Sequence, residues 1–211
     1  MELGTDRKSA AITHGVPMHE GPRTYIIFGA MRGGTTMVAG VMRGLGVNIG
    51  PHLDENNQES RAFNGPSIKD MVQSLQSQNA KDEIWGWKNP NAADYLDRIW
   101  SDIRNPHLIC VMRDPVANAQ GLNRWHSVGR IQSAQESVLR LQKNLNIISL
   151  RKCPSLMISY EKAVGAPDLF IDEFATWLGV EADAARTQFN FSEFMRPSSY
   201  KSFDEYKLTQ A

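Results

Sequence analysis

A glycine-rich bend that contains an arginine and leads into two threonines carries the residue types best suited to chemistry in this sequence. The bend, Gly29-Ala30-Met31-Arg32-Gly33-Gly34, follows an apolar run and is followed by Thr35 and Thr36. Glycines let a backbone fold around a phosphate, and the first turn of a helix offers amide N–H groups without internal partners. We therefore predict a phosphate-binding loop lined by Gly33, Gly34, Thr35 and Thr36. Turns of this composition also join strands to helices that bind nothing.

The position of the basic residue distinguishes this bend from the common nucleotide-binding loop. Gly29 and Gly34 have the spacing of G-x-x-x-x-G-K-[ST], but Thr35 stands at the lysine position and the cation is Arg32 instead. In kinases and ATPases that lysine reaches the outer phosphates, and the hydroxyl after it holds magnesium. The missing lysine counts against a kinase.

Two further cations follow predicted strands. Lys88 ends the run Ile84 to Lys88, and Arg113 follows His107 to Met112, an apolar run expected of a buried parallel strand. Open α/β sheets bind ligands at the carboxyl ends of such strands. The fork of N–H donors on Arg113 suits a phosphate, and a fixed ammonium at Lys88 would neutralise developing negative charge. The alternative for Lys88 is an exposed lysine at a strand end.

Asp114 permits two interpretations. A carboxylate after a hydrophobic strand holds magnesium in nucleotide triphosphatases. Asp114 also precedes Pro115, a residue favoured at the first position of a helix, so an ordinary helix cap explains it better. No Cys, His or Asp spacing in the sequence suggests a metal site.

Alternating apolar patterns predict the scaffold that positions these residues. We expect a three-layer α/β/α sandwich of the P-loop-like type around a mostly parallel sheet of four or five strands. Residues 1–22 are polar and broken by glycine and proline, so a flexible arm is expected there, followed by a single domain over 23–211. Strands are predicted at 25–28, 84–88, 107–112 and 156–161, and helices at 37–45, 65–78, 91–103, 132–152 and 168–178.

Composition excludes several classes of protein. The chain has 211 residues, enough for one sizeable core, and its 23 basic and 23 acidic residues balance. Nothing therefore indicates a binder of nucleic acid or of membrane surfaces. Two cysteines, Cys110 and Cys153, indicate a reducing compartment, and no stretch has the roughly 20 apolar residues that span a bilayer. We expect a soluble cytoplasmic protein, and the sequence indicates no oligomeric state.

Four segments in order resemble the sulfotransferases that depend on 3′-phosphoadenosine 5′-phosphosulfate (PAPS), in particular the bacterial type. They are R-x-G-T-T at Arg32 to Thr36, W-K-N-P at Trp87 to Pro90, M-R-D-P at Met112 to Pro115, and Tyr160-Glu161 with the helix that ends at Gly179. The resemblance covers Tyr25 to Val180. It implies transfer of a sulfuryl group from PAPS to a hydroxyl of a small-molecule, carbohydrate or lipid acceptor, with adenosine 3′,5′-bisphosphate (PAP) as product and no metal.

The resemblance also implies which residues hold the donor. The loop from Arg32 to Thr36 matches the 5′-phosphosulfate site, and Arg113 with position 121 matches the 3′-phosphate site. Gly33 and Gly121 stand where the family has serine, so Gly121 offers only its backbone N–H. Arg196, with Lys201, lies where many members close a basic loop over the cofactor, and a solvated tail is the other interpretation. Arg32 and Lys88 are implied to neutralise developing charge.

The general base follows from the same resemblance. Better-known cytosolic members have a histidine just after the strand lysine, and Asn89-Pro90-Asn91 contains none. Members without it use a glutamate in the loop after the first helix, with an arginine close behind, and Glu59-Ser60-Arg61 is similar. Glu59 is therefore the candidate base, with Glu55, Asp54 and His52 as rivals. A solvated or helix-capping carboxylate is the alternative.

Two other functions stay open at this point. A P-loop small-molecule kinase would turn over ATP with magnesium. A catalytically inactive nucleotide-binding module would bind PAP without transferring anything, and the departures at Gly33 and Gly121 leave room for it.

Overall fold

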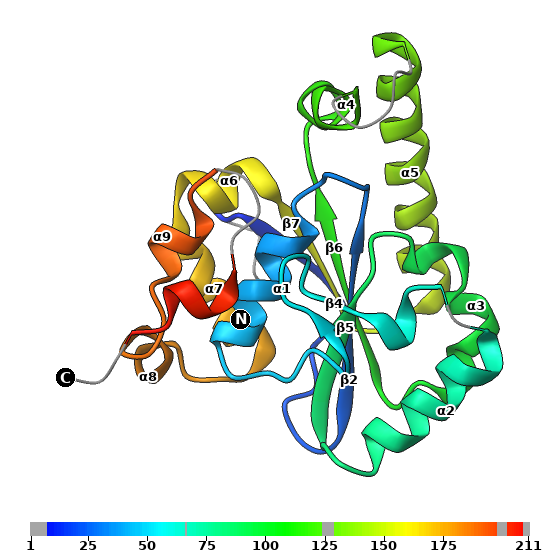
Figure 1. Ribbon diagram of the computed structural model, residues 1–211, viewed down its shortest axis with the longest axis vertical. Coiled ribbons are helices and arrows are strands. Elements are labelled where there is room, and N and C mark those ends of the chain that lie inside the picture. Colours follow the sequence, from blue (N-terminus) through cyan, green and yellow to red (C-terminus); the bar gives the residue numbers. More distant parts are fainter. Residues whose placement is uncertain (1–7, 66, 124–128, 198–201, 209–211) are drawn as a thin grey trace.

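A five-stranded sheet runs through the middle of the molecule (Figure 1). The computed structural model describes residues 8–65, 67–123, 129–197 and 202–208. The strand order is β1 (Ala11–His14), β7 (Ser155–Ser159), β6 (Pro106–Met112), β2 (Arg23–Gly29) and β5 (Ile84–Lys88). All neighbours pair in parallel except β1, which is antiparallel to β7. The predicted mostly parallel sheet is confirmed.

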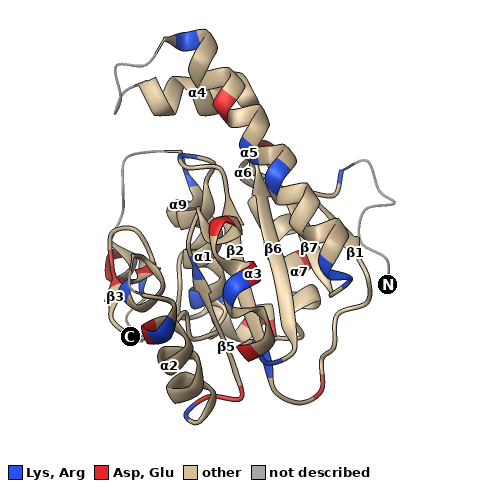
Figure 2. Ribbon diagram, turned by 90° about the vertical axis from the view of Figure 1, so that its right-hand side faces the viewer, with Lys and Arg blue, Asp and Glu red and all other residues tan. Residues whose placement is uncertain are grey.

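Helices cover both faces of this sheet and form the outer layers of a three-layer α/β/α sandwich. In Figure 1, α1, α6, α7 and α9 lie on one side, and α2, α3 and α5 lie on the other. Figures 1 and 2 both show α4 and the start of α5 extending past the sheet. The helices are α1 (Thr35–Gly44), α2 (Ile68–Asn79), α3 (Leu96–Ile99), α4 (Pro115–Asn123), α5 (Arg130–Arg151), α6 (Tyr160–Gly165), α7 (Pro167–Leu178), α8 (Ala182–Arg186) and α9 (Phe191–Met195).

Alternation along β2 explains the two cores. Tyr25 and Ile27 pack into the core beneath α1 and α7, whereas Ile26 and Phe28 pack into the core beneath α2 and α5. Successive side chains of a strand point to opposite faces, so a central strand must be apolar throughout. All seven residues of β2 are buried.

Short elements complete the chain. A two-stranded hairpin pairs β3 (Leu53–Asp54) with β4 (Glu59–Ser60) in the loop after α1. Four 3₁₀ turns occur in the described residues: η1 (Arg61–Phe63), η2 (Ala92–Asp94), η3 (Trp100–Asp102) and η4 (Phe203–Tyr206). None of the described helices combines the length and the apolar character that crossing a membrane requires.

Three expectations about the elements need correction. Ala11–His14 forms the edge strand β1 within the segment expected to be a flexible arm, because it pairs with the free side of β7. The single helix expected over 91–103 is wrong, since Tyr95 and Ile99 leave the helical conformation and divide it into η2, α3 and η3. Tyr160-Glu161, expected at the end of a strand, begins α6 instead.

A buried arginine fastens the segment before β2 to the core. Arg23 Nη2 donates to the carbonyl of Leu178 at 3.1 Å, and Nε donates to Tyr25 Oη at 2.7 Å. Its Nη1 donates to the carbonyls of His19 and Gly21. The guanidinium therefore lies at the carboxyl end of α7, where the helix dipole favours a cation.

His107 makes a second attachment to the same segment. Its Nε2 accepts the N–H of Met18 at 3.1 Å, so the ring proton is on Nδ1, which lies 3.0 Å from the carbonyl oxygen of Asn105. Burial, together with the nearby Arg23 guanidinium, lowers the pKa of His107 despite the Asn105 bond. Protonation would remove the acceptor that Met18 uses.

We expect acid to destabilise the protein through His107. The folded pKa lies below the ordinary value of 6.5, so the unfolded chain takes up the proton first as the pH falls. The contribution of His107 to the free energy of unfolding should be constant above about pH 7 and decrease as the pH falls through the unfolded pKa of about 6.5. Urea denaturation at pH 7.5 and 5.5 measures this decrease. A His107→Gln variant should show a smaller decrease, and an equal decrease in both proteins would contradict the assignment.

Candidate functional site

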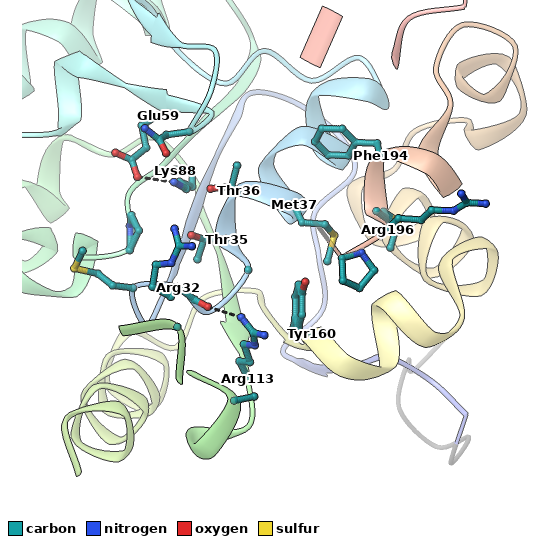
Figure 3. A pocket seen from close by; sticks show the side chains of 18 of the residues that line it. Arg32, Thr35, Thr36, Met37, Glu59, Lys88, Arg113, Tyr160, Phe194 and Arg196 are labelled. Atoms are coloured by element: carbon teal, nitrogen blue, oxygen red, sulfur yellow. Dashed lines mark hydrogen bonds and ion pairs between the residues drawn. The ribbon is translucent and has the colours of Figure 1, made fainter. Parts of the chain in front are cut away.

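A cleft of about 590 Å³ opens at the carboxyl ends of β2, β5 and β6 (Figure 3). It brings together side chains that are far apart in the sequence and come from six separate segments. Nine of the ten residues predicted for the site line it: Arg32, Gly34, Thr35, Thr36, Glu59, Lys88, Arg113, Gly121 and Arg196. Arg32 and Arg113 therefore face one cleft.

Gly33 is the predicted residue that does not line the cleft. Its N–H donates to the carbonyl of Ala30 at 2.9 Å and so closes the turn from within. A Cβ at position 33 would lie 2.7 Å from the Ala30 oxygen, which leaves no room for the serine that the sulfotransferase pattern has here. Gly33 shapes the bend, and its N–H is already used.

The amino terminus of α1 faces the cleft without a cap. Gly34 precedes the helix in the left-handed conformation, with φ 96°, and as a glycine it has no side chain that could cap the first turn. No acidic residue lies in that turn either. The free N–H groups and the positive end of the helix dipole are therefore available to an anion beside Thr35 and Thr36.

Two side chains from the segment after β6 hold consecutive carbonyls of the bend. Arg113 Nη1 donates to the carbonyl of Arg32 at 2.8 Å, and Asn118 Nδ2 donates to the carbonyl of Met31 at 2.8 Å. The Met31 carbonyl and the Arg32 N–H belong to one trans peptide, in which the two groups point in opposite directions. Because Asn118 binds the carbonyl, the Arg32 N–H points away from Asn118. The sequence analysis missed Asn118, since an asparagine within a helix carries no local sign that it is fully buried against a loop.

Arg113 is further fixed by aromatic and acidic neighbours. Its guanidinium carbon lies 4.7 Å from the ring centre of Tyr160, and its Nε lies 3.9 Å from Glu161 Oε1. Asp114, next to it, accepts the Ala117 N–H at 2.8 Å, which is the geometry of a helix cap. This observation favours the capping interpretation of Asp114 over a magnesium ligand.

Glu59 and Lys88 form an ion pair at one end of the cleft (Figure 3). Lys88 Nζ donates to Glu59 Oε1 at 2.5 Å, and the lysine side chain is only 2 % exposed, so the exposed-lysine alternative is wrong. Burial lowers the pKa of Lys88, and the negative charge of Glu59 partly offsets this effect. Each charge is thus the main compensation for the other.

The rivals of Glu59 in the same loop have other partners. Glu55 pairs with Arg43, and Asp54 Oδ1 accepts the N–H of Asn56 at 3.0 Å. Neither they nor His52 line the cleft. Among the acidic residues described in this loop, Glu59 is the one that does.

The carboxyl-terminal side of the cleft is apolar. Phe194, Met195 and Pro197 form this wall, and sequence analysis did not anticipate it because the helix that carries it is only five residues long. Arg196 lies at the opposite end from Glu59, with a side chain that is 72 % exposed and paired with Glu193 at 2.9 Å (Figure 3). Lys201 lies outside the described residues.

In the described part of the chain, no group of three or more His, Cys, Asp or Glu residues is placed to hold a metal ion. The positively charged side chains that line the cleft are those of Arg32, Lys88, Arg113 and Arg196. Any anion bound there would therefore meet guanidinium, ammonium and backbone N–H groups.

Two solved sulfotransferase structures share the fold of this chain. The sulfotransferase domain of the olefin synthase from Synechococcus PCC 7002 superposes with a TM-score of 0.57 and 17 % identity, covering 100 % of this chain and 94 % of that domain. Sulfotransferase STF9 from Mycobacterium avium gives 0.53 and 12 %, covering 89 % and 73 %. The chain has the sulfotransferase fold. No family model matches the chain, and no curated protein matches it in sequence.

The close contact between Gly34 and Tyr160 makes a prediction about stability. An alanine Cβ at position 34 would lie 2.2 Å from Tyr160 Cδ2, whereas at Gly46, also at positive φ, a Cβ would meet nothing within 4 Å. Both Gly→Ala variants should lose roughly 1–2 kcal/mol from the left-handed backbone. Gly34→Ala should lose about 1–3 kcal/mol more from the clash. Urea denaturation of both variants checks this, and equal losses would contradict the packing described.

Proposed function

We propose that this protein is a sulfotransferase that moves a sulfuryl group from PAPS to a hydroxyl of a small-molecule, carbohydrate or lipid acceptor. The observation that supports this most directly is the convergence of Arg32, Lys88 and Arg113 on the uncapped amino terminus of α1. A donor with two separate phosphate groups requires two separate cationic positions. The fold shared with the two sulfotransferases supports the same proposal.

In the proposed complex, the 5′-phosphosulfate lies on the first turn of α1 and the 3′-phosphate lies beside Arg113. Arg113 donates through Nη1 to the Arg32 carbonyl and its Nε faces Glu161, so Nη2 supplies the donors for the ligand. A Cβ at Gly121 would lie 3.1 Å from Arg32 Cβ, so glycine at this position leaves the arginine its path into the cleft. The sulfotransferase pattern has serine at position 121, and glycine at this position leaves more space around Arg32.

The ion pair supplies the proposed chemistry. Glu59 accepts the proton of the acceptor hydroxyl, whose oxygen attacks sulfur in line with the leaving phosphate oxygen. The S–O bond to the phosphate breaks, and its electron pair stays on that oxygen, where Lys88 and Arg32 neutralise the new charge. The mutual contact of Glu59 and Lys88 holds the base and the cation in place before the donor binds.

Titration calorimetry tests the donor assignment. We expect PAP to bind more tightly than ATP with magnesium, and a preference for ATP with magnesium would favour the kinase instead. Arg113→Ala should weaken PAP binding by about 10–100-fold, the loss of roughly 1.5–3 kcal/mol expected for hydrogen bonds to a charged group. Binding of adenosine 5′-monophosphate should weaken much less, through the lost contact with the Arg32 carbonyl alone.

A matched control is Arg186→Ala, which removes an arginine that pairs with Asp172 and does not line the cleft. This variant should leave both affinities unchanged. If Arg113→Ala weakens the binding of PAP and of the 5′-monophosphate equally, Arg113 does not bind the 3′-phosphate.

The base assignment is tested by Glu59→Gln. With PAPS and an accepting hydroxyl compound, kcat should fall by about 10²–10⁴-fold, the usual contribution of general base catalysis. PAP affinity should stay close to that of the unchanged protein. Glu55→Gln, in the same loop but outside the cleft, is the control and should keep its activity. Binding of PAP without transfer to any hydroxyl would identify an inactive nucleotide-binding module.

A further inference from the structure

A second hollow of about 450 Å³ adjoins the wall of the cleft. The segment that leaves β5 forms part of both, because its residues alternate between them. Lys88 and Pro90 line the cleft, whereas Asn89 and Asn91 line the second hollow. This segment is therefore a partition with the proposed catalytic lysine on one side and two carboxamides on the other.

The carboxylate of Glu59 links the two spaces. Its Oε1 accepts from Lys88, in the cleft, and its Oε2 accepts from Asn64 Nδ2 at 2.9 Å. Asn64 lines the second hollow. A molecule seated in that hollow would thus contact Asn64, the hydrogen-bond partner of the group that is proposed to take the acceptor proton.

The lining of the hollow is rich in neutral hydrogen-bonding groups. Asn89 is buried and held rigidly, since its Nδ2 donates to the Phe63 carbonyl at 2.6 Å and its Oδ1 accepts the Asn91 N–H at 2.8 Å. Burial raises the pKa of Tyr95, so its hydroxyl stays neutral. Carboxamides and hydroxyls both donate and accept, as sugar hydroxyls do.

Apolar surface in the hollow is limited, and one of its two charged lining residues, Arg98, carries a guanidinium that can donate to hydroxyl oxygens. Asp94 also lines it, but Arg140 Nη1 at 2.9 Å and Lys143 Nζ at 2.5 Å compensate that carboxylate. Ile68 and Met71 are the lining residues with large apolar side chains. An alkyl or phenolic acceptor would cover the Asn91 carboxamide without offering it a hydrogen-bond partner, which costs binding free energy.

We propose that this hollow is the acceptor subsite and that it binds the body of an uncharged, hydroxyl-rich molecule such as a saccharide, one of whose hydroxyls reaches Glu59. The proposal rests on the proposed function and narrows its acceptor class. Asn91 and Arg98 select the acceptor by contacting it away from the reacting atoms, and they leave the donor site untouched.

Transfer from labelled PAPS to a fixed panel tests this proposal. The panel contains methyl α-glucoside, maltose and myo-inositol against 1-hexanol and 4-nitrophenol, all at one concentration. We expect a polyol or saccharide to accept at least about tenfold faster than either simple alcohol or phenol, because unpaired amides discriminate strongly. Asn91→Ala and Arg98→Ala should each raise KM for the best saccharide by about 5–50-fold, the cost of one or two lost hydrogen bonds. The value of kcat and the PAP affinity should change less than about twofold, a split that general unfolding would not produce.

Two controls separate the possible failures. Asn146→Ala removes an exposed asparagine on α5 that bonds Gln142 and does not line the hollow, so KM should not change. Preferential transfer to 1-hexanol or 4-nitrophenol, no transfer to any saccharide or polyol, or an unchanged KM in both hollow variants would overturn the acceptor subsite while PAP binding still supported a sulfotransferase. Failure to bind PAP would overturn the proposed function itself.

Discussion

The parallel pairing of β2 with β5 and β6 is the constraint on which the cleft depends. Ile27 is the partner of Lys88 on one side and of Ile109 on the other, and Gly29 is the partner of Val111. This register aligns the ends of three strands at one edge of the sheet. The bend after β2, the lysine that ends β5 and the arginine after β6 consequently meet, although more than 80 residues separate Arg32 from Arg113.

Charge compensation is the second determinant of the cleft. A lysine as buried as Lys88 requires a nearby anion, and the hairpin of β3 and β4 delivers Glu59 to it. The same logic applies to Arg113, which uses a backbone carbonyl, an aromatic ring and Glu161. Partners within the protein therefore hold the charged groups of the cleft in position, which is the preorganisation that charge stabilisation in a transition state requires.

Much of the fold could be predicted because its signals are local. The apolar runs of β2 and β6 identified buried parallel strands, and residues that follow such strands lie at the ligand-binding edge of the sheet. The loop around Glu59 was harder, since the sequence contains four candidate side chains and only tertiary contacts distinguish them. The Arg43 pair removes Glu55 from consideration, and no periodicity reveals that pair.

Features that depend on distant contacts escaped prediction. The sequence around Asn118 is that of an ordinary helix. Its role depends on the hydrogen bond to the Met31 carbonyl, 87 positions earlier in the chain. The helix expected over 91–103 has good apolar spacing, yet the inward turn of Tyr95, whose hydroxyl accepts from Trp87 Nε1 at 3.0 Å, interrupts it.

The strand Ala11–His14 has a consequence for handling the protein. Without it, β7 would present a row of unpaired backbone groups along a strand that carries Leu156 and Ile158, and such margins recruit strands from other molecules. The edge strand on the other side of the sheet, β5, is partly covered by Asn48, whose carbonyl accepts the Gly86 N–H at 2.8 Å. A shortened protein that starts at β2 would keep every cleft residue but would be prone to aggregate. Loss of solubility after this truncation would therefore reflect the exposed edge of β7 and not a change in the cleft.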